Sequence, residues 1–219
     1  EERTRPKFMI LGILQEHFLD EGYDWMTSSI ASKASVVRVE DAAEAKKLLA
    51  ASAAQRPDAV LVIDGAVVEP RYRKLRAALV TFTKQGGTVV LGANFSNGLP
   101  WGEKTAEFFA QWGLTWQSGN YHRTTVHLNP NGIPGMDTQG LDESYSVKAL
   151  NLKNVHPSLR VYFPSSSSRT ESHVYEPIPV DTAQTPAAFV HVGRGYLGYI
   201  GDVNGEDPTT KLILRMLGL

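Results

Sequence analysis

The sequence predicts an α/β fold: a mostly parallel central sheet flanked by helices, with an additional antiparallel β portion in the C-terminal half. Two observations predict it. In the first half, short apolar runs alternate with amphipathic segments, and each run is apolar at consecutive positions. Such runs are typical of parallel strands that are covered on both faces. In the second half, polar and apolar residues alternate, as they do in strands with one face in solvent.

Four buried strands are expected in the first half, at residues 7–14, 35–40, 58–65 and 88–93. Helices separate them. Met26 and Ile30 lie four residues apart, which places them on one face of a helix at 23–34. Asp41 is expected to be the N-cap of the Ala-rich helix 42–54.

Two more helices follow the third and fourth strands. Pro70 opens the first, and a Gly-Gly pair at 86–87 ends it. The second covers about 103–112, with Phe108 and Trp112 facing inward. The buried side of the first helix is expected to consist of Leu75, Leu79 and Phe82.

The second half of the chain is expected to be richer in strands and loops. The serine-rich stretch 164–172 is read as an exposed loop. Residues 187–202 predict a hairpin that turns at Gly193-Arg194-Gly195, and Asp207-Pro208 is expected to cap a final helix. Further strands are expected within 115–130 and at 146–152 and 160–163.

Composition limits the classes of protein to consider. The 219 residues fit one globular domain with a substantial core. The chain begins with EERTRPK and no Met, so we expect residues 1–219 to be a single domain excised from a longer protein. The formal net charge of -1 gives no electrostatic signal for nucleic acid, and apolar runs such as AVLVI at 59–63 are too short to span a membrane.

The chain contains no cysteine, which excludes disulfides, thiolate catalysis and cysteine metal ligands. The compartment is left open, with an intracellular setting, cytoplasmic or nuclear, favoured. His122 and His127 lie five residues apart and would face opposite sides of one strand, so they would not bind one metal together. Neither a metal nor a cofactor is expected.

Several motifs resemble a known family. DAVLVIDG at 58–65, TVVLGANF at 88–95 and FVHVGRGYLGYIGDVNGEDPTTKLILRML at 189–217 are similar to the class I glutamine amidotransferase-like fold, in its ThuA-like branch. Related non-catalytic domains of this branch occur inside some sugar hydrolases. The resemblance covers most of the chain in the order of its elements and implies a flavodoxin-like or amidotransferase-like sheet.

The residues that would carry the family's chemistry differ in this chain. In amidotransferases the nucleophilic cysteine lies in the turn after the fourth strand, which is Gly-Ala-Asn-Phe at 92–95 here. ThuA-like proteins carry one histidine near that turn and another after the last strand. The first position is Ala93 or Asn94 in this chain, and the second is Asp202. Glutaminase activity is therefore not expected, and the resemblance implies a domain that lacks the catalytic residues.

Polar residues follow the carboxyl ends of the predicted strands, where open α/β sheets bind ligands. We call this set the polar collar; its members are Gln15, Glu16, His17, Asp64, Asn94, Ser96, Asp202, Asn204 and Glu206. Carboxylates and amides of this kind bind sugars and polyols or, through their oxygens, a metal. The alternative is that these residues cap helices and satisfy loop backbone.

Ser96 of the polar collar and the nearby Trp101 suggest more specific roles. Ser96 lies in NFSNG, which resembles the hydrolase elbow G-x-S-x-G without its first glycine, and no histidine stands in a suitable loop after the last strand. Trp101 follows a proline in a loop beside the crevice, where it would contact a partner or a sugar or else anchor the loop on the sheet.

The function predicted from the sequence is a non-catalytic, amidotransferase-like domain that acts as a protein-interaction or scaffolding module. Its partner would be another protein or other domains of the same polypeptide. The alternative is a ThuA-like protein that binds or modifies a sugar in the crevice. A weaker alternative is a serine hydrolase that uses Ser96.

Overall fold

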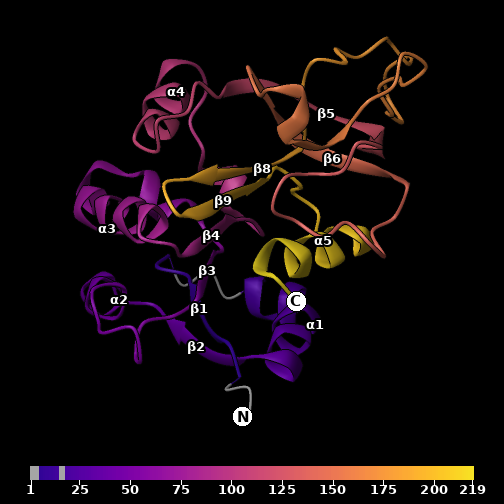
Figure 1. Cartoon of the computed structure of the whole chain (residues 1–219). Helices are drawn as coiled ribbons and strands as arrows, with labels where there is room; N and C mark the ends of the chain where they lie inside the picture. Colours follow the sequence, from indigo (N-terminus) through magenta and orange to yellow (C-terminus); the bar gives the residue numbers. More distant parts are fainter. Residues whose placement is uncertain (1–4, 15–17) are drawn as a thin grey trace.

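The computed structural model describes residues 5–14 and 18–219 and shows an α/β fold built on one mixed sheet (Figure 1). Within these residues the sheet has nine strands in the order β2-β1-β3-β4-β9-β8-β7-β5-β6. Strands β2, β1, β3, β4 and β9 pair in parallel, whereas β9, β8, β7, β5 and β6 pair antiparallel. The expectation of a mostly parallel sheet is therefore wrong: the two kinds of pairing share the sheet equally.

The parallel part of the sheet consists of short strands that alternate with helices. Its four N-terminal strands lie within the predicted ranges, and each is one to three residues shorter at its carboxyl end. The elements are β1 (Lys7–Leu11), α1 (Phe18–Lys33), β2 (Ser35–Val39), α2 (Ala42–Leu49), β3 (Ala59–Val62), α3 (Arg73–Lys84), β4 (Thr88–Leu91) and α4 (Glu103–Ala110).

The antiparallel part holds the longest strands and the last helix. Residues 115–130 contain one strand of 12 residues, and the hairpin 187–202 turns at Gly193-Arg194 as expected. The elements are β5 (Gln117–Leu128), β6 (Ser144–Lys153), β7 (Arg160–Phe163), β8 (Ala187–Val192), β9 (Gly195–Ile200) and α5 (Asp207–Leu217).

The helix start predicted at Asp41 is confirmed, whereas those predicted at Pro70 and Asp207 are displaced by three residues and by one. Asp41 is the N-cap of α2, because its carboxylate accepts the backbone N–H groups of Ala43 at 2.9 Å and Glu44 at 2.8 Å. Pro70 opens a separate 3-10 turn, Pro70–Tyr72, and α3 begins only at Arg73. The N-cap of α5 is Glu206 rather than Asp207, which is already the first helical residue.

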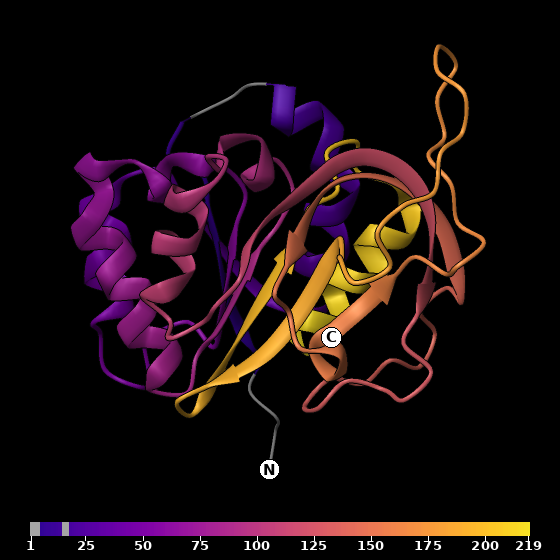
Figure 2. The ribbon, with the colours of Figure 1, turned by 90° about the horizontal axis from the view of Figure 1, so that it is seen from above.

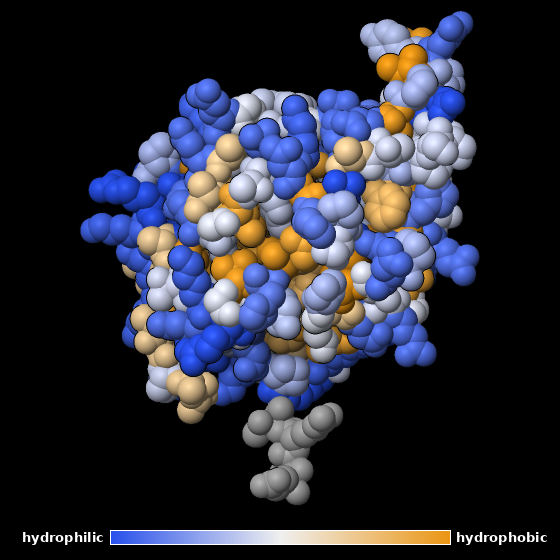
Figure 3. Space-filling view, turned by 45° about the horizontal axis from the view of Figure 1, so that its top comes forward, coloured by the Kyte–Doolittle hydropathy of each residue, from blue (hydrophilic) through white to orange (hydrophobic). Residues whose placement is uncertain are grey.

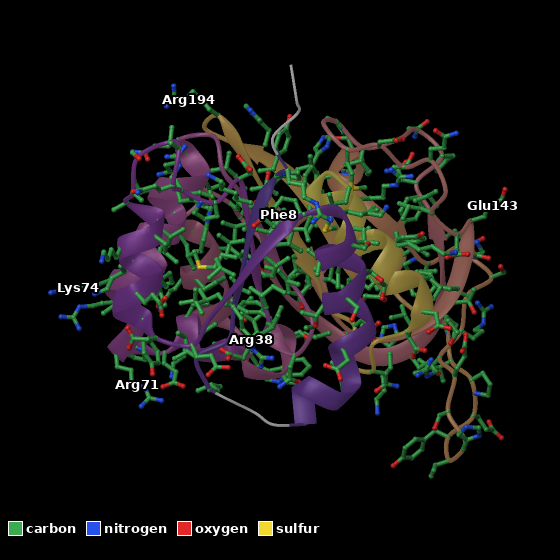
Figure 4. All side chains as sticks on the ribbon, turned by 90° about the horizontal axis from the view of Figure 1, so that it is seen from below. Phe8, Arg38, Arg71, Lys74, Glu143 and Arg194 are labelled. Carbon is green, nitrogen blue, oxygen red and sulfur yellow. The ribbon has the colours of Figure 1, made fainter. Side chains whose placement is uncertain are left out.

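Two apolar cores lie on the two faces of the parallel strands. Successive strand residues alternate between them, so that Met9 of β1 faces α2, α3 and α4, while Phe8 and Ile10 face α1 and α5. Figure 2 shows the helices on opposite sides of the sheet, and Figure 4 shows Phe8 inside while Arg71 and Lys74 point outward. Both faces are covered, which explains the continuous apolar runs.

Strand β6 bonds to the open end of the hairpin formed by β8 and β9, just before β8 and just after β9. Its Leu150 N–H donates to Gly201 O at 3.0 Å, and Leu152 exchanges two backbone bonds with Thr185. A Cβ on Gly201 would lie 2.0 Å from Leu150 O, so only glycine allows this approach. The antiparallel half thereby covers the edge at which β9 ends.

No helix in the described part of the chain combines the length and apolar character that a membrane span requires.

Candidate functional site

The carboxyl ends of β3, β4 and β9 lie next to one another because these strands are parallel neighbours. Four of the predicted site residues follow these ends: Asp64 after β3, Asn94 and Ser96 after β4, and Asp202 after β9. The structure thus places them at one edge of the sheet, and the hydrogen bonds of each determine what it can do there.

Asp64 is buried, and both of its oxygens are used by the backbone. One accepts the N–H of Leu14 at 2.9 Å and the other that of Ala66 at 2.9 Å. The first bond crosses from β3 to β1, which is the point where the strand order reverses and where α/β proteins bind ligands. At this point of the sheet, Asp64 joins the loop after β1 to the loop after β3.

The turn after β4 keeps a special backbone conformation. Ala93 has a φ of 52°, in the left-handed region that costs an ordinary residue about 1–2 kcal/mol. The nucleophile elbow of α/β-hydrolases uses a strained turn between a strand and a helix to expose its serine. Here the strained position carries a buried methyl group. Gly98 and Gly65 pack so closely that a Cβ on either would lie 2.5 Å from the other's Cα.

Ser96 is buried behind this turn. Its hydroxyl donates to Gly201 O at 3.2 Å, which ties the β4 loop to the end of β9. Among the described residues, no histidine bonds to this hydroxyl, and His17 lies outside them. Phe95 is fully buried beside it, with ring centroids 5.7 Å from Phe108 and 6.4 Å from Tyr199. An aromatic cluster therefore fills the space behind the turn.

Asp202 organises the loop that leads into α5. Its carboxylate accepts the backbone N–H groups of Asn204, Gly205 and Glu206, and the hydroxyl of Thr209 at 2.5 Å. Burial raises the pKa of Asp202, and the hydrogen bonds oppose that rise. The carboxylate thus orders the loop before α5, whose N-cap residue Glu206 makes no side-chain capping bond.

The other predicted site residues do not join a common pocket. Glu206 turns toward the antiparallel half, where it forms a 2.6 Å ion pair with Arg123 of β5. Asn94 accepts a hydrogen bond from the amide of Asn97, and Trp101 is 60% exposed rather than packed on the sheet. Within the part of the chain that the structure describes, no His, Asp and Glu side chains group as metal ligands would.

Gln15, Glu16 and His17 lie outside the described residues.

A second region was not predicted: an arm, residues 171–178, that projects from the body of the molecule (Figure 2). Its base is closed by Thr170 N–H donating to Ile178 O at 2.9 Å. At its tip, the Ser172 hydroxyl accepts the N–H groups of Val174 and Tyr175. Apolar side chains stand on it in solvent, at upper right in Figure 3: Val174 is 81% exposed, Tyr175 76% and Ile178 60%.

The base of the arm is fixed to the sheet. The Glu171 carboxylate accepts the hydroxyls of Thr125 at 2.7 Å and Ser146 at 2.5 Å, one from β5 and one from β6. Its backbone N–H donates to Arg123 O at 2.8 Å, and the Thr124 hydroxyl donates to Arg169 O at 2.7 Å. The arm therefore projects from an ordered base.

Between the arm and the outer surface of β5 and β6 lies a hollow of about 1370 Å³, which we call the arm groove. Its sheet wall carries Tyr121, which is 45% exposed, with Lys148 Nζ 5.4 Å from the centre of its ring. His122 and His127 both line the groove. The Nε2 atom of His122 is buried without a hydrogen-bond partner among the described residues, and burial lowers the pKa of this imidazole.

An unpaired buried polar atom costs about 1–3 kcal/mol, and His122 Nε2 is such an atom among the described residues. The sequence did contain a signal for the arm. Val174, Tyr175 and Ile178 follow directly on the serine-rich stretch, and a loop that keeps large apolar residues is unusual in a solvent-exposed segment.

Comparisons with known proteins relate this chain to others by fold. No family model matches it, and no curated protein sequence matches it. It is similar to a β-galactosidase from Bacillus circulans sp. alkalophilus, with a TM-score of 0.53 and 13% identity over 98% of this chain and 31% of that one. It is also similar to a ThuA-like protein from Parabacteroides merdae, with a TM-score of 0.53 and 10% identity over 99% of this chain and 89% of that one.

A third similar structure is a cytoplasmic protein from Salmonella typhimurium LT2, with a TM-score of 0.53 and 11% identity over 96% of this chain and 95% of that one. The fold is thus shared with a ThuA-like protein and with part of a larger glycosidase. The chain spans about a third of the length of that glycosidase, and these low identities show the fold alone.

Proposed function

We propose that this chain is a non-catalytic domain of the ThuA-like fold that acts as a protein-interaction or scaffolding module, with the arm and the arm groove as its binding surface. The observation that carries the proposal is the exposure of Val174, Tyr175 and Ile178 on an arm whose base is fixed. Exposed apolar side chains that gather beside a concave surface are typical of interaction sites.

The bonding at the strand ends supports a non-catalytic role. Asp64 and Asp202 use their oxygens to hold their own loops, and the Ser96 hydroxyl bonds to a backbone carbonyl. A nucleophile needs a base within hydrogen-bond reach, and no described histidine bonds to Ser96. The position at which the elbow is strained holds Ala93, whose methyl group offers no chemistry.

The domain context also supports the proposal. A chain of this fold matches part of a β-galactosidase, so the fold can occur as one domain of a longer polypeptide. An interaction module in such a setting would bind a neighbouring domain or a partner protein.

The test is affinity purification of the full-length protein with quantitative mass spectrometry, comparing three forms. The arm variant replaces Val174 and Tyr175 with serine, and the control replaces Trp101, which is also highly exposed, with serine. We expect the arm variant to lose its specific partners and the Trp101→Ser control to keep them. If the Trp101→Ser control lost the partners and the arm variant kept them, the binding surface would lie elsewhere.

A second candidate function is carbohydrate binding in the arm groove, favoured by the exposed ring of Tyr121 beside hydroxyl and imidazole groups. Aromatic rings with nearby polar groups are suited to sugar faces. Glycan-array binding that disappears in Tyr121→Ala would support this candidate, and an absence of binding to any glycan would remove it.

A further inference from the structure

We propose that the partner of the arm groove is a second copy of this chain, and that two copies exchange their arms reciprocally to form a symmetric dimer. This inference rests on the proposed function, because it takes the arm and the groove to be the binding surface. It adds the identity of the partner and the contacts that would hold it.

The arm and the opposite wall of the groove are both unpartnered within one chain. The arm projects from the body (Figure 2), and its tip side chains stand in solvent, while the wall on β5 and β6 lies across the hollow. One chain therefore carries both a projecting apolar element and a concave surface with room for such an element.

The charges of the two surfaces complement each other. Glu176 is the acidic residue of the arm tip, and it has no hydrogen-bond or ion-pair partner among the described residues. Among the described residues of the wall, Lys148 has no carboxylate partner, whereas Arg123 is paired with Glu206 and the Glu171 carboxylate is bonded to Thr125 and Ser146. Glu176 and the apolar residues of the tip would meet Lys148 and the exposed ring of Tyr121.

The tip and the wall also each expose an aromatic ring. Tyr175 on the arm is 76% exposed, and Tyr121 on the wall is 45% exposed. Tyrosine suits such a contact because its ring buries apolar area while its hydroxyl makes a directional bond. The tip of a second copy would thus supply an aromatic residue, a hydroxyl and a carboxylate.

Symmetry makes the arrangement closed. Each copy would donate one arm and receive one, so every favourable contact would occur twice and no binding surface would be left over. The partner is specified by the chain itself, because the same sequence supplies both complementary surfaces.

The test is sedimentation velocity over a concentration series, with charge reversals on the two surfaces. We expect the wild type to dimerise, and we expect Glu176→Lys and Lys148→Glu each to raise the dissociation constant by about tenfold or more, because each places like charges together at both contacts. An equimolar mixture of the two variants should restore dimerisation, since both contacts between unlike variants again join opposite charges.

The matched control is Lys104→Glu, a charge reversal at an exposed residue of α4 that has no ion pair among the described residues. It should leave the dissociation constant unchanged. Tyr175→Ser is a second probe, and circular dichroism would check that every variant is folded. The inference would be overturned if the wild type stayed monomeric or if its dimer were insensitive to both charge reversals. It would also be overturned if the mixture of the two variants failed to dimerise.

The outcomes separate this inference from the proposed function. If the wild type is monomeric and the arm variant still loses a different protein partner, the second-copy inference is overturned and the proposed function stands. If neither self-association nor partner binding depends on the arm, both fail.

Discussion

The two halves of this sheet use similar polar residues in opposite ways. At the carboxyl ends of the parallel strands, Asp64 and Asp202 are buried and bonded to their own loops. On the antiparallel half, Tyr121, His122 and Lys148 line an open groove, and the ring of Tyr121 is 45% exposed there. The polar groups that follow the parallel strands are thus bonded within the chain, at the edge where an α/β fold ordinarily binds ligands.

This difference separates stability from association. Substitutions at the strand ends should lower the free energy of unfolding, because they remove buried contacts and buried acceptors. Substitutions on the arm should leave that free energy unchanged and act on binding. The following predictions test the separation, from the largest expected effect on stability to the smallest.

Phe95→Ala should have the largest effect, lowering the free energy of unfolding by about 3–5 kcal/mol. Phe95 is fully buried between Phe108 and Tyr199, so its removal leaves a cavity in the aromatic cluster. Urea unfolding followed by circular dichroism would measure the change. Trp101→Ala is the control, because an exposed tryptophan removes little packing; a comparable loss in both would mean that the crevice is not packed as described.

Asp202→Ala should lower the free energy of unfolding by about 2–3 kcal/mol, because it leaves several partly buried N–H donors without an acceptor. The Thr209 hydroxyl loses its acceptor too. Asn204→Ala is the matched control, since Asn204 contributes its backbone N–H to this network and its side chain is exposed. A ligand-binding role for Asp202 would instead predict a stable Asp202→Ala variant that has lost binding.

Ser96→Ala should cost about 1 kcal/mol, the net contribution of one hydrogen bond to Gly201 O. The same variant tests the hydrolase alternative. We expect a fluorophosphonate probe to leave the wild type unlabelled, because the hydroxyl is buried and bonded to the backbone. Labelling of the wild type that disappears in Ser96→Ala would establish the hydrolase and contradict the non-catalytic proposal.

The strands and helices were predictable where a local pattern decides the structure. Apolar runs gave the buried strands, and the spacing of Met26 and Ile30 gave the buried face of α1. The balance of parallel and antiparallel pairing was not predictable, because it depends on contacts such as Leu152 with Thr185 that join distant parts of the chain. A local pattern does not specify which strands pair.

The candidate site was predictable in position and not in bonding. The sequence places Asp64, Ser96 and Asp202 after strands whose ends meet, and the structure puts them there. It does not reveal that their acceptors and donors are already paired, since Ser96 meets Gly201 across 105 positions of sequence. The arm was missed because a serine-rich stretch was read by composition, while its base is fixed by Thr125 and Ser146 on distant strands.

Asp181→Asn tests an exposed carboxylate of the antiparallel half. Like Asp202, Asp181 accepts a backbone N–H group of its own loop. Hydrogen bonds from Ala183 N–H and then from the Gln184 amide lower the pKa of Asp181 below its ordinary value of 3.8. A lowered pKa in the folded state contributes stability above the unfolded pKa, and that contribution is lost as the pH falls through the lowered value.

The wild type should therefore be more stable than Asp181→Asn at pH 7 by less than about 1 kcal/mol, because the group is exposed and screened. The difference should shrink toward zero as the pH falls from 5 to below the folded-state pKa. Unfolding by urea at a series of pH values would show it. A difference that grows on acidification would contradict this assignment.

The smallest effect on stability is expected for Val174→Ser with Tyr175→Ser, within about 0.5 kcal/mol, because both side chains are in solvent within one chain. The measurement must be made at protein concentrations where the chain is monomeric, since binding to the folded state raises apparent stability by mass action. At higher concentration the wild type should gain stability and the variant should not. A loss by the dilute variant as large as that of Phe95→Ala would mean that the arm packs on its own body in solution. The groove would then be filled by its own chain, and the contrast between the two halves would no longer hold.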